Sequence, residues 1–236
     1  MKLGTLYGLG VGPGDPEWIP VKAVRILAAC RHVFVPKARG EGESVALDIA
    51  RCYLRPDAVV QELTFPMSKD HGVLAECWRQ AAEEVCRCLQ QGEDAAFLTL
   101  GDPLLYSTYI YLLRAVRELQ PEISAVTVPG ITAFSAAAAL ANFPVGQGKQ
   151  LVTIVPASDD LQQFADALDR GGTVVLMKIG DRLPNALDVL RARGLLPRAV
   201  FVSRAGMPQQ RVETDLTKLQ ELEPKAGYLS ILIVQA

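Results

Sequence analysis

The fold is decided by the stretch Leu98-Thr99-Leu100-Gly101-Asp102-Pro103-Leu104, in which a buried strand runs directly into a tight turn. Residues 95–100 are apolar at nearly every position, as is typical of a parallel strand covered on both faces. Gly101 permits an unusual backbone conformation, Asp102 is a good N-cap, and Pro103 suits the first residue of a helix. The stretch predicts a strand, a turn and a helix over residues 103–119. Asp102 is either part of a ligand-holding junction or a simple helix cap.

Three further strands end in unusual turns. The first strand, residues 3–10, leads into Gly8-Leu9-Gly10-Val11-Gly12-Pro13-Gly14-Asp15-Pro16. Residues 126–128 lead into Pro129-Gly130-Ile131-Thr132 and a helix of small residues, and residues 173–178 lead into the turn 177–181. Ligands of open α/β sheets bind outside the carboxyl ends of the strands. The four turns are therefore expected to line one crevice, and the glycines predict a backbone that something approaches closely.

The glycine-rich turn does not match a dinucleotide site. The third glycine of G-x-G-x-x-G is replaced by Pro13 or Asp15, depending on the starting glycine. The second strand, residues 32–35, ends in Pro36-Lys37, where an NAD site needs an acidic residue.

The order of the elements predicts two α/β domains. Strands and helices alternate up to Gln120-Pro121-Glu122, which indicates a mainly parallel sheet covered by helices and a boundary near Pro121. Later strands, over residues 150–155, 173–178, 199–202 and 228–234, follow one another more closely, which favours a mixed sheet. Residues 212 and 214 fall in a connection, and residues 216–222 read as a helix. The predicted domains are residues 1–119 and 122–236, with a cleft between them.

Composition narrows the function. Half of the 236 residues are hydrophobic and the net charge is −2, which argues against a nucleic-acid partner. The five cysteines contain no CxxC, and neither His32 nor His71 has a ligand at metal-binding spacing along the chain, so no protein-bound metal is expected. No leader sequence is recognisable and the alanine-rich run is too short to span a bilayer. A cytoplasmic protein without a membrane partner is expected.

The motifs resemble a known family. The turns ending Gly12-Pro13-Gly14-Asp15-Pro16, Gly101-Asp102-Pro103 and Pro129-Gly130-Ile131-Thr132-Ala133, in that order, are similar to those of the tetrapyrrole (corrin and porphyrin) methyltransferases. Residues 100–112, with Val33-Phe34-Val35-Pro36-Lys37 and Phe65-Pro66-Met67, resemble the subgroup that methylates carbon 20 of precorrin-2 or cobalt-factor II in cobalamin synthesis. The resemblance covers essentially the whole chain.

The resemblance implies an S-adenosylmethionine-dependent enzyme that is a homodimer and carries no metal of its own. Any cobalt would arrive within the tetrapyrrole substrate. One departure is Lys178, where many members of the family place a glycine directly after the methionine. The implied substrate contacts are Pro13, Gly14, Asp15, Lys37 and Tyr106, and the implied contacts to S-adenosylmethionine are Gly101, Asp102, Pro103, Leu104, Ser107, Thr132, Ala133 and Met177.

The chemistry needs no catalytic triad, because an electron-rich meso carbon is itself the nucleophile and positioning supplies most of the acceleration. A base must still remove the meso proton, and Asp102, Tyr106, His71, solvent and the substrate all remain candidates. The substrate carboxylates are expected to meet basic side chains near strand ends or in loops. These are Lys37, Arg39, Lys178, Arg204 and Arg211.

Other functions remain open from the sequence. A sister enzyme acting at another ring position would share the cofactor motifs. A methyltransferase of ribosomal RNA or of a protein is expected to show a basic face or a docking surface, whereas this chain is slightly acidic. A nucleotide-binding oxidoreductase or a non-catalytic binding module could use the same glycine-rich turn, and titration with S-adenosylmethionine and with NAD would separate these classes.

Overall fold

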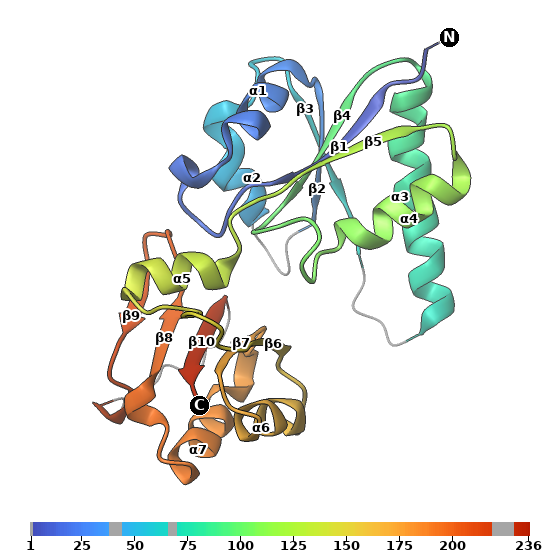
Figure 1. Cartoon of the computed structure of the whole chain (residues 1–236). Helices are drawn as coiled ribbons and strands as arrows, with labels where there is room; N and C mark the ends of the chain where they lie inside the picture. The colour runs from blue at the N-terminus through green and yellow to red at the C-terminus, as the bar shows by residue number, and fades with distance from the viewer. Residues whose placement is uncertain (1, 38–43, 66–69, 219–228) are drawn as a thin grey trace. The chain divides into compact units, whose positions relative to one another are not determined.

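The computed structural model describes residues 2–37, 44–65, 70–218 and 229–236. The chain divides into two compact units, Met1–Thr132 and Ala133–Ala236. Each unit contains one five-stranded sheet with helices packed on it (Figure 1).

The sheet of the first unit is entirely parallel. Its strand order is β3-β2-β4-β1-β5, so β1 and β4, which are far apart in the sequence, lie side by side at its centre. The other neighbouring pairs, β2–β3, β2–β4 and β1–β5, are parallel as well. The strands are β1 (Thr5–Gly10), β2 (His32–Pro36), β3 (Val59–Leu63), β4 (Ala95–Thr99) and β5 (Ser124–Val128).

Helices cover both faces of this sheet. On one face pack α1 (Val21–Ala29) and α2 (Val45–Ala50), and on the other α3 (His71–Gln90) and α4 (Tyr109–Leu119) (Figure 1). Successive residues of β4 alternate between the two cores, because side chains of a strand point to opposite faces in turn. Phe97 packs with α3 and α4, and Leu98 with α1 and α2. Two short 3-10 helices are η1 (Pro16–Trp18) and η2 (Arg51–Tyr53).

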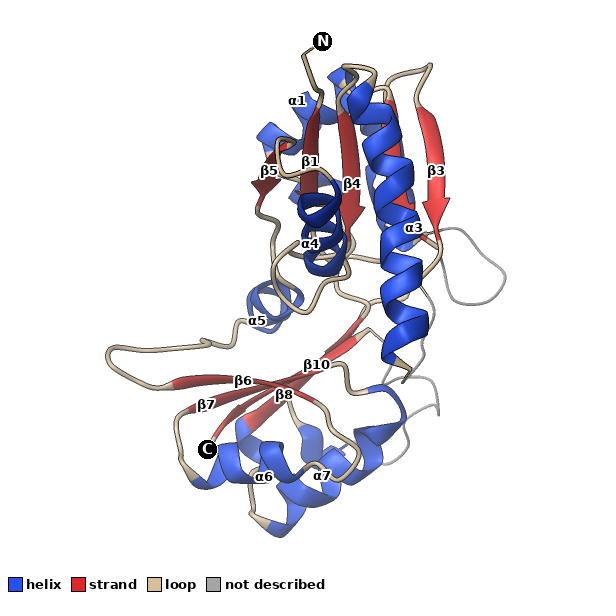
Figure 2. Cartoon of the chain, turned by 90° about the vertical axis from the view of Figure 1, so that its right-hand side faces the viewer, coloured by secondary structure: helices blue, strands red, loops and turns tan. Residues whose placement is uncertain are grey.

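The sheet of the second unit is mixed, with the order β6-β7-β10-β8-β9. The pair β6–β7 is parallel, and β10 and β9 are antiparallel to their neighbours. Helix α5 packs against β8, β9 and β10 on one face, and α6 and α7 cover the other (Figure 2). The elements are α5 (Ala133–Ala141), β6 (Val152–Pro156), α6 (Gln162–Asp169), β7 (Thr173–Met177), η3 (Gly180–Arg182), α7 (Leu183–Ala192), η4 (Leu196–Arg198), β8 (Ala199–Ser203), β9 (Arg211–Glu213), η5 (Leu216–Lys218) and β10 (Ser230–Gln235).

The predicted fold class is confirmed: one α/β sheet is parallel and the other is mixed. The predicted boundary near Pro121 falls too early. That proline follows the end of α4, but the next segment returns as β5 and pairs with β1, so the first unit ends at Thr132. A proline stops a helix, whereas a domain ends only where its sheet is complete.

Two predictions in the second unit need correction. Residues 211–213 form strand β9, an edge strand paired with β8, where a connection was expected. Residues 216–218 are a 3-10 helix, and the rest of the predicted helix, residues 219–222, lies outside the described residues. Within the described residues, no helix has the length and apolarity needed to cross a bilayer.

Candidate active site

Three of the four unusual turns meet at the carboxyl end of the first sheet. Strands β4, β1 and β5 are consecutive in the sheet order and parallel, so the turns that follow Thr99, Gly10 and Val128 leave the sheet at the same end. Sheet topology thus brings together residues separated by more than a hundred positions in the sequence. The fourth turn follows β7 in the second unit.

The backbones of these three turns pack directly on one another. A Cβ added to Gly130 would lie 2.1 Å from the carbonyl oxygen of Gly101, and one added to Gly10 would lie 2.5 Å from the amide nitrogen of Gly130. Gly12 and Gly101 also exchange backbone hydrogen bonds of 2.8 and 3.3 Å, with positive φ angles of 76° and 74°. A side chain at Gly10 or Gly130 would clash with backbone atoms, and the positive φ angles of Gly12 and Gly101 favour glycine. The close approach predicted from the glycines is, at Gly10, made by the protein's own backbone.

Gly8 is explained by an aromatic ring. A Cβ at Gly8 would lie 2.1 Å from Cζ of Tyr109, which is fully buried and forms a 3.3 Å hydrogen bond between its hydroxyl and Oγ1 of Thr127. Burial raises the pKa of this phenol. The sequence indicates only that Tyr109 is a core or edge aromatic, because the apolar pattern of α4 does not show which ring faces Gly8 in β1.

Asp102 joins two of the turns. One carboxylate oxygen accepts a hydrogen bond from the Leu104 amide at 2.8 Å, and the other accepts one from the Gly130 amide at 3.0 Å. The half-buried carboxylate is therefore not the cap of an α-helix starting at Pro103, as its position in the sequence suggested. It connects the turn after β4 to the turn after β5, and charge-assisted bonds of this kind are stronger than neutral ones.

Helix α4 begins later than predicted, at Tyr109. Tyr106 has a positive φ of 52°, which interrupts a helical path through residues 103–108. The Ser107 hydroxyl accepts a hydrogen bond from the Tyr109 amide at 3.0 Å and lies 3.5 Å from the Thr99 hydroxyl. Ser107 is buried, so it orders the start of the helix, while Leu104 is 57% exposed and Tyr106 is 38% exposed.

The other predicted substrate contacts lie on the loops that follow β1 and β2, the two strands on either side of β4. Pro13 and Gly14 are buried, and the Asp15 carboxylate accepts a 2.9 Å hydrogen bond from the Glu17 amide at the start of η1. Lys37 follows β2 at the carboxyl end of the sheet with an exposed side chain, and its amide donates to the Leu63 carbonyl. Of these residues, Lys37 is the one most available to a ligand.

The remaining predicted contacts fall on either side of the division between the units. Thr132 is the last residue of the first unit and is half-buried, as is Ala133, the first residue of α5. Half-buried Met177 ends β7, and its carbonyl accepts a 2.8 Å hydrogen bond from the Ala157 amide. The next residue, Lys178, has φ of 56°, a conformation that glycine adopts at lower cost.

The other basic and candidate base residues divide between the two units. Arg211 forms a 2.7 Å ion pair with Glu213 and is thus already engaged, whereas Arg204 is half-buried after β8 with φ of 50°. His71 is the first residue of α3, and Arg39 lies outside the described residues. Strands β7 and β8 are both antiparallel to β10, and Arg211 pairs with Ser203, so Lys178, Arg204 and Arg211 lie at the same end of the second sheet. Lys37 belongs to the first unit.

Known proteins share this arrangement of elements. The family model of tetrapyrrole (corrin/porphyrin) methylases matches residues 5–223. The cobalt-precorrin-2 C(20)-methyltransferase of Salmonella typhimurium is 34% identical over 98% of this chain and 96% of its own length. The precorrin-2 C(20)-methyltransferase of a Sinorhizobium species is 32% identical over 98% and 95%. A precorrin-4 C(11)-methyltransferase of Pseudomonas aeruginosa is 32% identical over 58% of this chain and 47% of its own length.

Solved structures agree in fold. A cobalt precorrin-4 methyltransferase aligns with a TM-score of 0.75 at 18% identity, over 98% of this chain and 94% of that one. The uroporphyrin-III C-methyl transferase of Thermus thermophilus, solved with S-adenyl homocysteine, aligns with a TM-score of 0.64 at 22% identity, over 98% and 97%. With three motif turns gathered at one end of a parallel sheet and a family match over nearly the whole chain, this protein belongs to the tetrapyrrole (corrin/porphyrin) methylases.

Proposed function

We propose that this protein transfers a methyl group from S-adenosylmethionine to carbon 20 of precorrin-2 or of its cobalt complex in cobalamin synthesis. The observation that carries the proposal is the similarity to two C(20)-methyltransferases over nearly the full length of both proteins. The C(11)-methyltransferase matches little more than half of this chain. Identity of 32–34% sustained over nearly the full length of both proteins favours a shared substrate.

The residues at the carboxyl end of the first sheet fit S-adenosylmethionine as the donor. Leu104 and Ile131 expose apolar side chains on the turns that Asp102 connects. Apolar surface suits the adenosyl group, and the Asp102 carboxylate favours a positively charged ligand. When bound, the donor supplies an electrophilic methyl group. The proposed contacts to it are Gly101, Asp102, Pro103, Leu104, Ser107, Thr132, Ala133 and Met177, of which Ser107 acts by ordering the loop before α4.

The chain's contribution to the reaction is positioning. Glycine backbones locked against one another leave the turns little freedom, so a ligand that binds them is held in one orientation. Orientation of this kind can lower a barrier by roughly 7–11 kcal/mol in favourable cases. Tyr106, with its exposed ring beside the Asp102 turn, is our candidate for a group that contacts the macrocycle. Both oxygens of Asp102 accept backbone hydrogen bonds, so we assign it the role of a positioning residue.

The tetrapyrrole carboxylates are proposed to meet basic side chains, with Lys37 first among them because it is exposed at the carboxyl end of the first sheet. Pro13, Gly14 and Asp15 form the adjoining turn, with a role in shaping the binding site. The active form is proposed to be a homodimer in the cytoplasm, and sedimentation of the purified protein at several concentrations tests its oligomeric state.

Turnover of two substrates tests the function. Purified protein is incubated with S-adenosylmethionine and either precorrin-2 or its cobalt complex, and the product is analysed by mass spectrometry and NMR. We expect a mass gain of one methyl group and a new methyl signal assigned to carbon 20. A methyl group at another carbon would reject the ring position, and binding of NAD without binding of S-adenosylmethionine would reject the reaction class. The faster substrate identifies whether cobalt precedes this step.

A further inference from the structure

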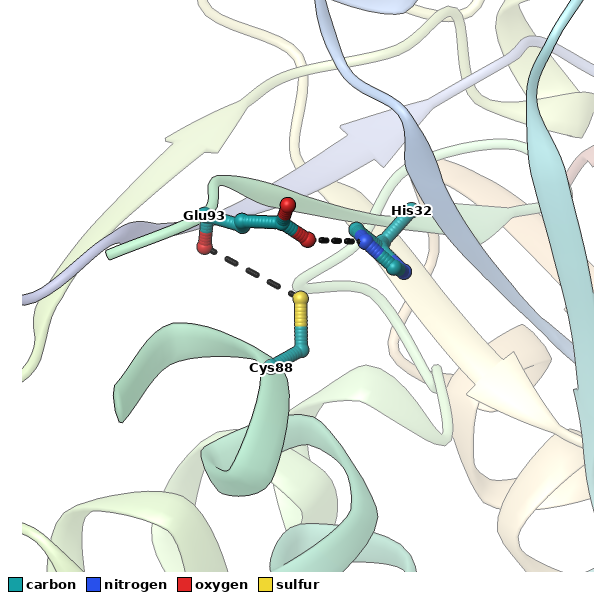
Figure 3. A group of neighbouring side chains, drawn as sticks. All are labelled: His32, Cys88 and Glu93. Atoms are coloured by element: carbon teal, nitrogen blue, oxygen red, sulfur yellow. Dashed lines mark hydrogen bonds and ion pairs between the residues drawn. The ribbon is translucent and has the colours of Figure 1, made fainter. Parts of the chain in front are cut away.

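Three potential metal ligands converge at the amino end of the first sheet, the end opposite the candidate active site (Figure 3). His32 is the first residue of β2, Cys88 lies in the last turn of α3, and Glu93 lies in the turn before β4. His32 and Glu93 are 61 positions apart in the sequence. One ligand atom from each of the three residues lies within 4.8 Å of the other two, and no second group of this kind occurs among the residues that the structure describes.

The three side chains are positioned by rigid elements. His32 pairs with Ala95 across the β2–β4 ladder, which fixes it beside the turn that carries Glu93. Figure 3 shows the Cys88 side chain pointing from the helix toward the other two. His32 Nε2 is hydrogen-bonded to the Glu93 carboxylate, and the Cys88 thiol donates to the Glu93 carbonyl at 3.9 Å. The cluster is thus already assembled in the folded chain.

We propose that His32, Cys88 and Glu93 form a binding site for Zn²⁺. Imidazole nitrogen, thiolate sulfur and carboxylate oxygen are the three ligand types that Zn²⁺ accepts, and the thiolate disfavours the hard cations Mg²⁺ and Ca²⁺. A zinc ion about 2.0–2.3 Å from each ligand holds neighbouring ligand atoms roughly 3–4 Å apart. The three ligand atoms already lie within 4.8 Å of one another, and binding would replace the His32–Glu93 hydrogen bond with two coordination bonds.

The surroundings allow a fourth ligand and access from solvent. Glu93, with 43% of its side chain exposed, lines a hollow of about 510 Å³ together with Cys30, Asp94 and the cations Lys2, Arg31 and Arg55. His32 and Cys88 do not line this hollow, so Glu93 is the ligand that joins the cluster to it. Water from this hollow can complete a tetrahedral site. Three protein ligands and one open position are the arrangement of zinc sites that bind exchangeable groups. Arg55 is engaged by Asp57 through two hydrogen bonds of 2.5 and 3.1 Å, which reduces its repulsion of a cation.

The metal-free cluster keeps its proton on sulfur. Burial and the nearby carboxylates of Glu93 and Asp94 raise the pKa of the Cys88 thiol to about 11. The same carboxylates favour a divalent cation, which displaces the proton when it binds. The site is separate from methyl transfer, since it uses none of the residues proposed for the donor or the tetrapyrrole, and it departs from the sequence-based expectation that the protein binds no metal.

Cobalt substitution tests the site. Metal-free protein is titrated with Co²⁺, whose thiolate complexes show a charge-transfer absorption in the near ultraviolet, and the cobalt is then displaced with Zn²⁺. We expect one equivalent per chain. Cys88→Ser should abolish the absorption, and His32→Gln and Glu93→Gln should each weaken binding at least tenfold. Cys86→Ser and Cys30→Ser are matched controls, because both thiols are buried nearby and neither belongs to the cluster, and they should bind as the parent does.

The outcome does not depend on every variant folding. In the parent protein, Zn²⁺ should raise the melting temperature and slow alkylation of Cys88 at least tenfold, with the modified cysteine identified by mass spectrometry. An absorption that persists in Cys88→Ser, or that disappears in Cys52→Ser, would mean adventitious binding at an exposed thiol and overturn the proposal. Alkylation of Cys88 that is unaffected by Zn²⁺ would leave a hydrogen-bonded His32–Glu93 pair with no metal function.

Discussion

The two ends of the five-stranded parallel sheet differ in the groups that meet there: backbone atoms at the carboxyl end and side chains at the amino end. At the carboxyl end, turns after β4, β1 and β5 meet through backbone atoms, with Gly10, Gly101 and Gly130 in direct contact and one carboxylate, Asp102, connecting them. At the amino end, the side chains of His32, Cys88 and Glu93 converge beside an open hollow.

The two kinds of site leave different signals in the sequence. A backbone-built site needs glycine, proline and a capping residue in consecutive order, so it leaves a local motif. A site built from side chains needs only that the ends of its strands and helices lie near one another, as those of β2, α3 and β4 do. Its ligands can therefore lie anywhere in the sequence.

The largest effect is expected in the reactivity of two thiols: buried Cys30, at the amino end of the first sheet, should react far more slowly than exposed Cys52. Burial, Asp94 and Cys88 raise the pKa of the Cys30 thiol from 9.0 to about 12. Because the thiolate is the reactive form, a shift of this size leaves about a thousandfold less thiolate at pH 7.5 than an ordinary cysteine has. Iodoacetamide should therefore modify exposed Cys52 first and Cys30 last, as followed by peptide mass spectrometry on metal-free protein.

The sign of the pH effect is fixed by the same shift. Below a raised pKa the reactive fraction grows about tenfold per pH unit, so alkylation of Cys30 should accelerate steadily from pH 7 to 10. A Cys30 rate equal to that of Cys52 at pH 7.5 would show that the amino end of the sheet is open and its thiols ordinary.

Gly130→Ala should cause the largest loss of stability at the carboxyl end. The new methyl group would lie 2.1 Å from the Gly101 carbonyl oxygen and 2.7 Å from Cα of Gly10. Both of these are backbone atoms, which cannot rotate away as a side chain can. We expect the free energy of unfolding to fall by roughly 3 kcal/mol, the upper part of the usual range for overpacking. Gly72→Ala in the first turn of α3 is the matched control, because its nearest neighbour is a side-chain oxygen at 3.3 Å. Equal stability of the two variants in urea denaturation would refute the locked-backbone account.

Asp102→Asn should weaken the donor site more than the fold. The amide keeps one acceptor oxygen but turns a donor toward the second backbone amide, so one of the bonds to Leu104 and Gly130 is lost. Because the two turns are then no longer held together, the donor must draw them into place when it binds. The cost of the lost bond to a charged group, about 2 kcal/mol, would appear as about a thirtyfold rise in the Kd for S-adenosylmethionine. Calorimetric titration measures it. Asp160→Asn, which removes a similar carboxylate that accepts from the Gln162 amide, should leave this Kd unchanged.

Tyr109→Phe should have the smallest effect. It removes the hydroxyl that bonds Thr127 at 3.3 Å and keeps the ring that packs on Gly8, so about 1 kcal/mol of stability should be lost and donor binding retained. Thr127→Val and the double variant complete a thermodynamic cycle. A coupling energy near zero would show that the Tyr109–Thr127 hydrogen bond adds nothing, and that the ring stabilises β1 by packing against Gly8 alone.

The alternation of apolar strands and amphipathic helices predicted both sheets, the parallel character of the first and the mixed character of the second. Residues 95–100 were predicted as a buried strand, and the structure forms it over Ala95–Thr99. The sequence predicts that the next helix begins at Pro103, because Asp102 and Pro103 are typical of a helix start. In the fold the same carboxylate bonds Gly130, and the positive φ of Tyr106 delays α4.

Local chemistry in the sequence by itself determined the strands, the turns and the family to which they belong, since glycine and proline restrict the backbone wherever they occur. The tertiary structure alone decided which turns are neighbours, that β5 completes the first sheet beyond Pro121, and that Tyr109 fills the space above Gly8. It also gathered His32, Cys88 and Glu93, whose spacing along the chain had argued against a metal site. Strand order is set by long-range pairing, and no local pattern records which ends will meet.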